Sequence, residues 1–226
     1  MLAYGIDGCR AGWIAVKLAP DDVRDFTIIE RIDQLSPLDR AMVFIDIPIG
    51  LPDSGYRGCD LAARKLLKEA RSRVFLGLRR PLLRYSGDYA AANEWGKSDG
   101  KGLAKQSFAI LPKIAEIDAV MSPARQETFR ESHPELVFQR LNNGTALRSK
   151  HTPAGIAVRR NMVAQAGFTD IDGWLGALRG SGAKADDLLD ACVLAVAARD
   201  AAHGDAQRVA CAERRDARGL RMEIWF

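Results

Sequence analysis

Acidic residues stand at places where the chain is otherwise apolar. Asp7 ends the first apolar run, and Asp46 interrupts the continuously apolar run Ala41–Ile47. Asp190 lies inside a third apolar segment with a helical pattern. A buried carboxylate costs on the order of several kcal/mol unless it is paired or bound to a cation. These three acids are therefore candidates for chemistry.

Two further acids extend the set. A spacing of three residues puts Asp187 and Asp190 on one face of a helix, so that both can point at one target. Glu131 ends a short predicted strand over Thr128–Glu131. Each acid also has an ordinary explanation, as a turn residue, a helix N-terminal residue or a surface residue. These alternatives stay open.

One chemistry would account for the acids together. Carboxylate oxygens from separate elements can converge on Mg²⁺ or Mn²⁺, the ions that prefer such ligands. Two such ions about 3.5–4 Å apart activate water and stabilise the leaving oxygen in phosphodiester cleavage. The sequence has no P-loop, GxGxxG, GxSxG or HExxH motif that would indicate another chemistry.

The elements that must position these acids begin with strands. Gly or Asp turns separate three short apolar runs and predict an antiparallel meander over Tyr4–Asp7, Trp13–Lys17 and Phe26–Arg31. The apolar run at 41–47 predicts a central strand, which Pro48 ends. A late strand is predicted over Met222–Phe226.

Helices follow the central strand. The pattern predicts them over Cys59–Ala70, Asp88–Trp95, Gln106–Met121, His133–Gly144, Thr152–Gly167 and Asp186–His203. The fold class is therefore α/β, a mixed sheet whose first three strands are antiparallel and whose later strands are parallel, flanked by helices. We expect a single domain over residues 1–226 with a helical insertion at 53–125.

Composition excludes several classes of protein. The 226 residues carry 33 Lys+Arg against 29 Asp+Glu, a net charge of +4, and 47 % are hydrophobic, which excludes a disordered chain and a disulfide-rich mini-protein. The longest apolar run, Ala191–Ala198, is far shorter than the ~20 residues that a bilayer needs, and no signal peptide is seen. Cys9, Cys59, Cys192 and Cys211 show no CxxC spacing, so we expect reduced thiols in a cytoplasmic protein.

Basic residues gather in two segments. The first holds Arg64, Lys65, Lys68, Arg71, Arg73, Arg79, Arg80 and Arg84, and the second holds Arg148, Lys150, His151, Arg159 and Arg160. Such clusters bind a phosphate backbone without sequence specificity, and aromatic residues nearby would stack on bases. A solvated helix face is the other explanation. We expect nucleic acid, RNA or DNA, as the partner and no membrane.

The arrangement resembles a known fold. An Asp on the first strand, a carboxylate on the next crossover strand and a DxxDA final helix look like the RNase H-like fold. The chain also resembles the DUF 429 family, which is described as predicted RNase H-like nucleases. Four motifs carry this resemblance: Ile6–Trp13 (IDGCRAGW), Phe44–Pro52 (FIDIPIGLP), Glu131–Glu135 (ESHPE) and Asp187–Ala191 (DLLDA). Arg57–Asp60, Arg64 and Gln106–Lys113 also match.

The resemblance implies roles for individual residues. Asp7 would be the central metal ligand, Asp46 would hold one ion, and Asp190 or Asp187 would complete the other. Glu131 would be the fourth catalytic carboxylate. His133, with a near-neutral ordinary pKa, is a candidate for proton transfer, and a structural cap is the alternative. Candidate substrate-binding residues are Arg10, Arg57, Arg64, Gln106 and Lys113.

The expected function is that of a metal-dependent nuclease that hydrolyses phosphodiester bonds of nucleic acid with Mg²⁺ or Mn²⁺. Two alternatives remain. One is a nucleotide-binding phosphotransferase of the sugar kinase and actin superfamily, whose first strand also carries an Asp-Gly turn. The other is a non-catalytic nucleic-acid-binding module with the RNase H-like fold.

Overall fold

The chain folds into two compact units. The structure, a computed structural model, describes residues 1–21, 23–36, 38, 40–212 and 214–226. Unit 1 comprises Met1–Asp46, Thr128–Gln207 and Trp225–Phe226, and unit 2 comprises Ile47–Glu127 and Arg208–Ile224. The predicted insertion at 53–125 therefore falls within unit 2, which also takes in residues 208–224.

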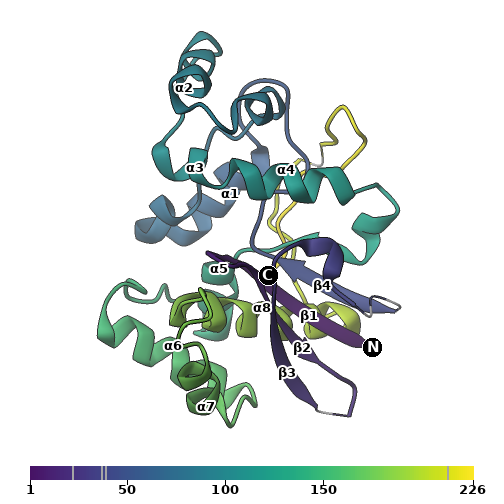
Figure 1. Cartoon of the computed structure of the whole chain (residues 1–226), viewed down its shortest axis with the longest axis vertical. Coiled ribbons are helices and arrows are strands. Elements are labelled where there is room, and N and C mark those ends of the chain that lie inside the picture. Colours follow the sequence, from purple (N-terminus) through teal and green to yellow (C-terminus); the bar gives the residue numbers. More distant parts are fainter. Residues whose placement is uncertain (22, 37, 39, 213) are drawn as a thin grey trace. The chain divides into compact units, whose positions relative to one another are not determined.

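Unit 1 is built on a five-stranded mixed sheet (Figure 1). Its strands are β1 (Leu2–Cys9), β2 (Gly12–Leu18), β3 (Arg24–Ile29), β4 (Ala41–Ile45) and β5 (Phe129–Glu131), in the order β3-β2-β1-β4-β5. The first three pair antiparallel, whereas β4 runs parallel to β1 and β5 runs parallel to β4. The predicted α/β class and the mixed sheet are confirmed.

The predicted late strand is wrong. The C-terminal segment forms a parallel bridge between Ser132 and Trp225, and Phe226 exchanges backbone hydrogen bonds with Gln207 (2.7 and 2.8 Å). The Trp225 N–H donates to the Glu131 carbonyl (3.0 Å), and the Ser132 hydroxyl donates to the Trp225 carbonyl (2.7 Å). These bonds fix the chain end, but the bridge to Ser132 involves one residue of the segment, so within the described residues the sheet is not extended by a further strand.

The helices of unit 1 are α5 (Pro134–Leu141), α6 (Pro153–Gln165), α7 (Ile171–Ala177) and α8 (Ala185–His203). The short 3-10 turn η1 (Ile32–Gln34) also belongs to this unit. Helices α5 and α6 begin with proline directly after a capping side chain, as the sequence predicts, and Gly204 ends α8 in the left-handed conformation. Helix α7 was not predicted.

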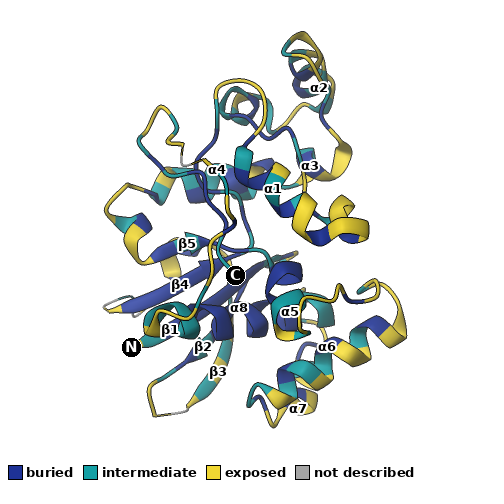
Figure 2. Cartoon of the chain, turned by 180° about the vertical axis from the view of Figure 1, so that it is seen from behind, coloured by how far each residue is buried: buried dark blue, intermediate teal, exposed yellow. Residues whose placement is uncertain are grey.

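Helix α8 lies at the centre of unit 1. Every residue from Leu188 to Ala198 is buried, as the dark ribbon in Figure 2 shows. One side of α8 packs against β1, β2 and β4, and it also contacts α5 and α6. A helix that is buried all round needs apolar residues all round, which explains its continuously apolar sequence.

Gly5 sets the distance between β1 and α8. A Cβ at this position would lie 2.0 Å from the Ala191 carbonyl oxygen and 2.1 Å from the Ala195 nitrogen. Neither backbone atom can move aside without moving the helix. Successive side chains of a strand point to opposite faces, so Asp7, two residues after Gly5, also faces α8.

Unit 2 is mainly helical. It contains α1 (Gly58–Leu67), α2 (Tyr89–Ser98), α3 (Lys105–Ala109) and α4 (Leu111–Val120), with 3-10 turns η2 (Lys68–Arg73), η3 (Arg80–Tyr85) and η4 (Arg125–Glu127). The predicted helix over 106–121 is interrupted, because Pro112 lacks an N–H and crowds the preceding turn. Arg80 bonds to Asp118 (2.7 Å) and to Asp216, which ties residues 208–224 to η3 and α4.

Among the described residues, no helix combines the length and apolar character needed to cross a bilayer.

Candidate functional site

Asp7 and Asp46 lie next to each other at the carboxyl ends of two parallel strands. The Asp46 N–H donates to the Ile6 carbonyl (3.0 Å), which extends the β1–β4 ladder by one residue. Gly5 pairs with Phe44 in this ladder, and two residues later the same register places Asp46 beside Asp7. Both acids therefore share the face that α8 covers.

Asp190 reaches this place from α8. Its helix approaches β1 closely at Gly5, one turn along from the acid, and the Asp190 residue is only 1 % exposed. Its Oδ1 is buried and has no hydrogen-bond partner within the part of the chain that the structure describes. Asp7, Asp46 and Asp190, called here the carboxylate cluster, thus come from three separate elements.

The pKa values of the cluster are raised. Burial raises the pKa of Asp7 well above its ordinary value, and the charges of Asp46 and Asp190 raise it further. Burial also raises the pKa of Asp46, against the lowering effect of His133 and Lys150. Burial raises the pKa of Asp190 to about 7, although Lys150 opposes this shift. The acids therefore repel one another, and a bound cation would relieve the repulsion.

Lys150 supplies a positive charge to the cluster. Its Nζ donates to Asp190 Oδ2 (2.5 Å) and lies 3.7 Å from Asp186 Oδ2. Burial alone would lower the pKa of Lys150, but Asp190 and then Asp7 raise it above the ordinary lysine value. The sequence predicted this residue only as part of a basic patch. It comes from the segment between α5 and α6, and no spacing in the sequence links it to the acids.

A divalent ion such as Mg²⁺ requires several oxygen ligands that converge on one point. In residues 1–21, 23–36, 38, 40–212 and 214–226, no group of three or more His, Cys, Asp or Glu side chains is arranged to hold a metal ion. The cluster nevertheless offers carboxylate oxygens, including the buried Oδ1 of Asp190, which no described residue hydrogen-bonds. The cluster therefore offers donor atoms of the type that a hard cation takes, without the arrangement of a metal site, and Lys150 contributes one positive charge.

The chain was also compared with known proteins. A family model described as protein of unknown function, DUF429, matches residues 5–214. The chain belongs to the DUF429 family. No curated protein and no solved structure matches this DUF429 protein at the threshold of the comparison.

In the DUF429 protein, Glu131 lies apart from the carboxylate cluster. It pairs with Ile45 on β4, whereas the α8 face of that strand carries Phe44 and then Asp46. The alternation of side chains puts Glu131 on the opposite face of the sheet. The residue is buried there (5 % exposed). The structure thus brings Asp7, Asp46 and Asp190 together and places the fourth predicted carboxylate elsewhere.

His133 and Asp187 act as helix caps. The His133 Nδ1 accepts a hydrogen bond from the Glu135 N–H (3.3 Å) at the start of α5. The Asp187 Oδ2 accepts one from the Lys184 N–H (2.8 Å) at the start of α8. Both remain close to the cluster, since His133 lowers the pKa of Asp46 and Asp187 raises that of Asp7. Burial raises the pKa of Asp187 itself.

Arg159, which was predicted as part of a basic patch, forms a buried ion pair with Glu135. Arg159 is 0 % exposed, and its Nη2 donates to both carboxylate oxygens of Glu135 (2.6 and 2.8 Å). Its Nη1 donates to the carbonyls of Arg148 and Gly155. Arg159 therefore joins α5 to α6 and is not part of a surface for phosphate.

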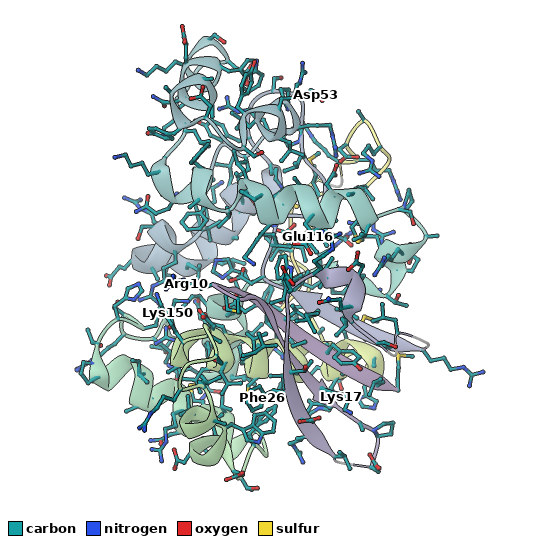
Figure 3. The ribbon with its side chains drawn as sticks, viewed as in Figure 1. Arg10, Lys17, Phe26, Asp53, Glu116 and Lys150 are labelled. Carbon is teal, nitrogen blue, oxygen red and sulfur yellow. The ribbon has the colours of Figure 1, made fainter. Side chains whose placement is uncertain are left out.

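The predicted substrate-binding residues have different environments. Arg57 is 1 % exposed and lies 3.4 Å from Asp60 Oδ1, so the structure gives no phosphate access to it. Arg10 is exposed in the β1–β2 turn, where its N–H donates to the Gly182 carbonyl (Figure 3). Gln106 is exposed on α3, and Lys113 is half-buried on α4, so the two lie on different helices and not on the single predicted one.

Arg64 lines a basic groove in unit 2. The groove has a volume of ≈ 860 Å³ and is lined by Leu61, Arg64, Lys65, Lys68, Glu69 and Arg71, from α1 and η2. Lys68 has a backbone φ of 49°, which a residue with a side chain rarely adopts. We call this feature the α1–η2 groove.

Proposed function

We propose that this DUF429 protein is a metal-dependent nuclease whose active site is the carboxylate cluster of unit 1. The observation that carries the proposal is the convergence of three buried acids from β1, β4 and α8, one of which keeps a buried oxygen without a hydrogen-bond partner among the described residues. Such an arrangement is costly for stability, and strongly raised pKa values of this kind are concentrated at functional sites.

The residues would act as follows. Asp7, Asp46 and Asp190 Oδ1 would hold Mg²⁺ or Mn²⁺, which when bound activates water and stabilises charge on phosphate oxygens. Lys150 neutralises Asp190 and keeps the cluster from carrying its full negative charge next to a phosphate. The Nδ1 of His133 accepts the α5 cap hydrogen bond, so a proton carried to or from the site would pass through its Nε2.

The strand order supports the finer fold proposal. An antiparallel β1–β2–β3 meander followed by parallel β4 and β5, with a central helix on one face, is the arrangement expected of an RNase H-like domain. We propose this fold for unit 1 and a cytoplasmic location for the protein. Cys9, Cys59, Cys192 and Cys211 form no disulfide with one another, which fits a reducing compartment.

Cleavage assays test the proposal directly. Purified wild type is incubated with single-stranded RNA, single-stranded DNA, duplexes, RNA–DNA hybrids and branched DNA in Mg²⁺, Mn²⁺ or EDTA. We expect metal-dependent cleavage that Asp7→Asn and Asp190→Asn each reduce by about a hundredfold or more. Asp25→Asn is the control, because Asp25 is exposed on β3. No cleavage of any substrate by wild type would refute the proposal.

We propose that the α1–η2 groove of unit 2 is by itself a surface for nucleic acid. The groove carries four cations against one acid, and large apolar side chains stand exposed near it in the sequence, namely Tyr56, Leu61, Leu66 and Phe75. Cations that follow the backbone and aromatic rings that stack on bases are how proteins bind single-stranded nucleic acid.

Binding measurements test the groove separately. We expect Lys65→Glu with Lys68→Glu to weaken oligonucleotide binding and to reduce the slope of log K against log salt by about two, one for each lysine that no longer neutralises a phosphate. Lys97→Glu, the same change at an exposed lysine on α2 of the same unit, should leave the affinity and the salt slope unchanged. Equal losses in all variants would mean that the groove has no special role.

A non-catalytic binding module is the second candidate. It is favoured by Lys150, because the ammonium already neutralises Asp190 and within the described chain no metal-holding group is arranged. Tight nucleic-acid binding without cleavage, unchanged by Asp7→Asn, would support this candidate over the nuclease.

A further inference from the structure

Lys150 is the feature of the cluster that the nuclease proposal does not by itself explain. Its ammonium contacts Asp190 Oδ2 at 2.5 Å, while Asp190 Oδ1 stays buried without a hydrogen-bond partner in the described part of the chain. One oxygen of this acid is therefore occupied by a cation of the protein itself, and the other is left for a ligand.

The charges in the cluster can be counted. Asp7, Asp46 and Asp190 carry three negative charges when ionised, and Lys150 carries one positive charge. The remaining charge of minus two is the charge that a single divalent ion neutralises. Two divalent ions would bring four positive charges to a site that already holds an ammonium, which a small partly buried site disfavours.

The neighbouring charges are paired, opposed or screened, so the count is made on the three acids and Lys150. Glu135 is paired with the buried guanidinium of Arg159, although its charge still raises the pKa of Asp46 and Asp190. His133 lowers the pKa of Asp46, which opposes the effect of Glu135 on the same acid. Asp187 accepts a backbone hydrogen bond at the start of α8. The side chain of Asp186 is 22 % exposed, so solvent screens its charge.

We propose that Lys150 takes the place of a second divalent ion, so that the carboxylate cluster binds one such ion rather than two. This rests on the proposed function and replaces the two-ion expectation of the sequence analysis. The ammonium stays on Asp190 Oδ2, and Asp7, Asp46 and Asp190 Oδ1 bind the ion. Lys150 is thus a positioning residue that sets both the charge and the stoichiometry of the site.

Metal titration of the full chain tests this. Mn²⁺ binding is followed by calorimetry and by the electron paramagnetic resonance signal of free Mn²⁺, for wild type and for Lys150→Met. We expect one Mn²⁺ per chain in wild type and two in Lys150→Met. Lys150→Arg, which keeps a cation at this position, should bind one.

Lys17→Met is the matched control. Lys17 lies on β2 opposite Tyr4, and strand alternation puts it on the face away from α8, while Lys150 lies on the loop before α6 (Figure 3). Lys17→Met should bind one ion like wild type. Circular dichroism and thermal melting in the presence of Mn²⁺ establish that each variant is folded.

The outcomes separate the two proposals. Wild type that binds two ions, or a folded Lys150→Met that still binds one, overturns the role of Lys150 and leaves the nuclease proposal in place. Wild type that binds no Mn²⁺ and cleaves no nucleic acid overturns the proposed function, and the role of Lys150 with it. Because the stoichiometry of wild type is itself decisive, the test does not depend on the folding of a variant.

Discussion

Replacing Asp7 with asparagine is expected to make the metal-free protein more stable at neutral pH. Burial and the neighbouring charges of Asp46 and Asp190 raise the pKa of Asp7 well above its ordinary value, so its ionised form is disfavoured in the folded state. Asparagine has nearly the same shape, and its Oδ1 can still accept the hydrogen bond that Gly8 N–H donates at 2.7 Å. The substitution therefore removes a charge and keeps the geometry.

The magnitude follows from linkage. A carboxyl with an ordinary pKa of 3.8 costs about 1.36 kcal/mol per pH unit to keep protonated, so the penalty at pH 7 has an upper limit of about 4 kcal/mol. The pKa of Asp7 is higher in the folded state than in the unfolded state. The free energy of unfolding of wild type is therefore highest below pH 3.8, where Asp7 is protonated in both states, and it falls as the pH rises toward the folded pKa. The buried amide of the variant loses some hydrogen bonding, so we expect a net gain of about 1–3 kcal/mol at pH 7, or about 5 °C in Tm.

Urea denaturation in EDTA, followed by circular dichroism between pH 4 and pH 8, measures this gain. The advantage of Asp7→Asn should be absent near pH 4 and should grow with pH. Asp25→Asn is a matched control, because Asp25 is exposed and likewise accepts a hydrogen bond from the next N–H, that of Phe26, at 2.8 Å. An Asp7→Asn variant that is less stable than wild type at pH 7, or a difference that does not grow with pH, would refute the reasoning.

Two further substitutions test how the site is held. Gly5→Ala should lower the free energy of unfolding by about 3 kcal/mol in urea denaturation, because its Cβ would lie 2.0 Å from a backbone oxygen of α8, whereas Gly176→Ala on α7, with nothing within 4 Å, should not. Glu135→Gln should lower the free energy of unfolding by about 3–5 kcal/mol, because the buried Arg159 loses its charged partner. Asp172→Asn, which removes an ion pair on the surface, should leave the unfolding midpoint close to that of wild type.

Much of unit 1 could be predicted because local patterns agree with the final packing. The alternation of apolar runs and Gly or Asp turns gave the meander, and proline after a capping residue gave the starts of α5 and α6. The break between α3 and α4 at Pro112 could also have been predicted from the missing N–H. Helix α7 is only seven residues long and contains two glycines, so its pattern is weak.

The carboxylate cluster was predictable because each acid interrupts an apolar segment. Its surroundings were not. Lys150 reaches Asp190 only because α5 and α6 pack against α8, a long-range contact that leaves no periodic pattern in the sequence. Glu131 ends a strand of three residues, too short for alternation to indicate which face it occupies. Arg57 and Arg159 show that charge alone does not predict exposure, because a buried carboxylate partner can hold a guanidinium inside.

The burial of α8 from Leu188 to Ala198 also affects the rate of amide hydrogen exchange. Backbone amides from Leu188 to Ala198 should exchange with solvent only when unit 1 opens as a whole, because no part of this segment is exposed. Asp190 and, through Gly5, Asp7 are fixed to this slowest part of the unit. Lys150, in contrast, lies at the end of a mostly exposed connection between α5 and α6. The exposed amides of this connection should therefore exchange sooner than those of α8, so hydrogen exchange would report the surroundings of the cation separately from those of the anions.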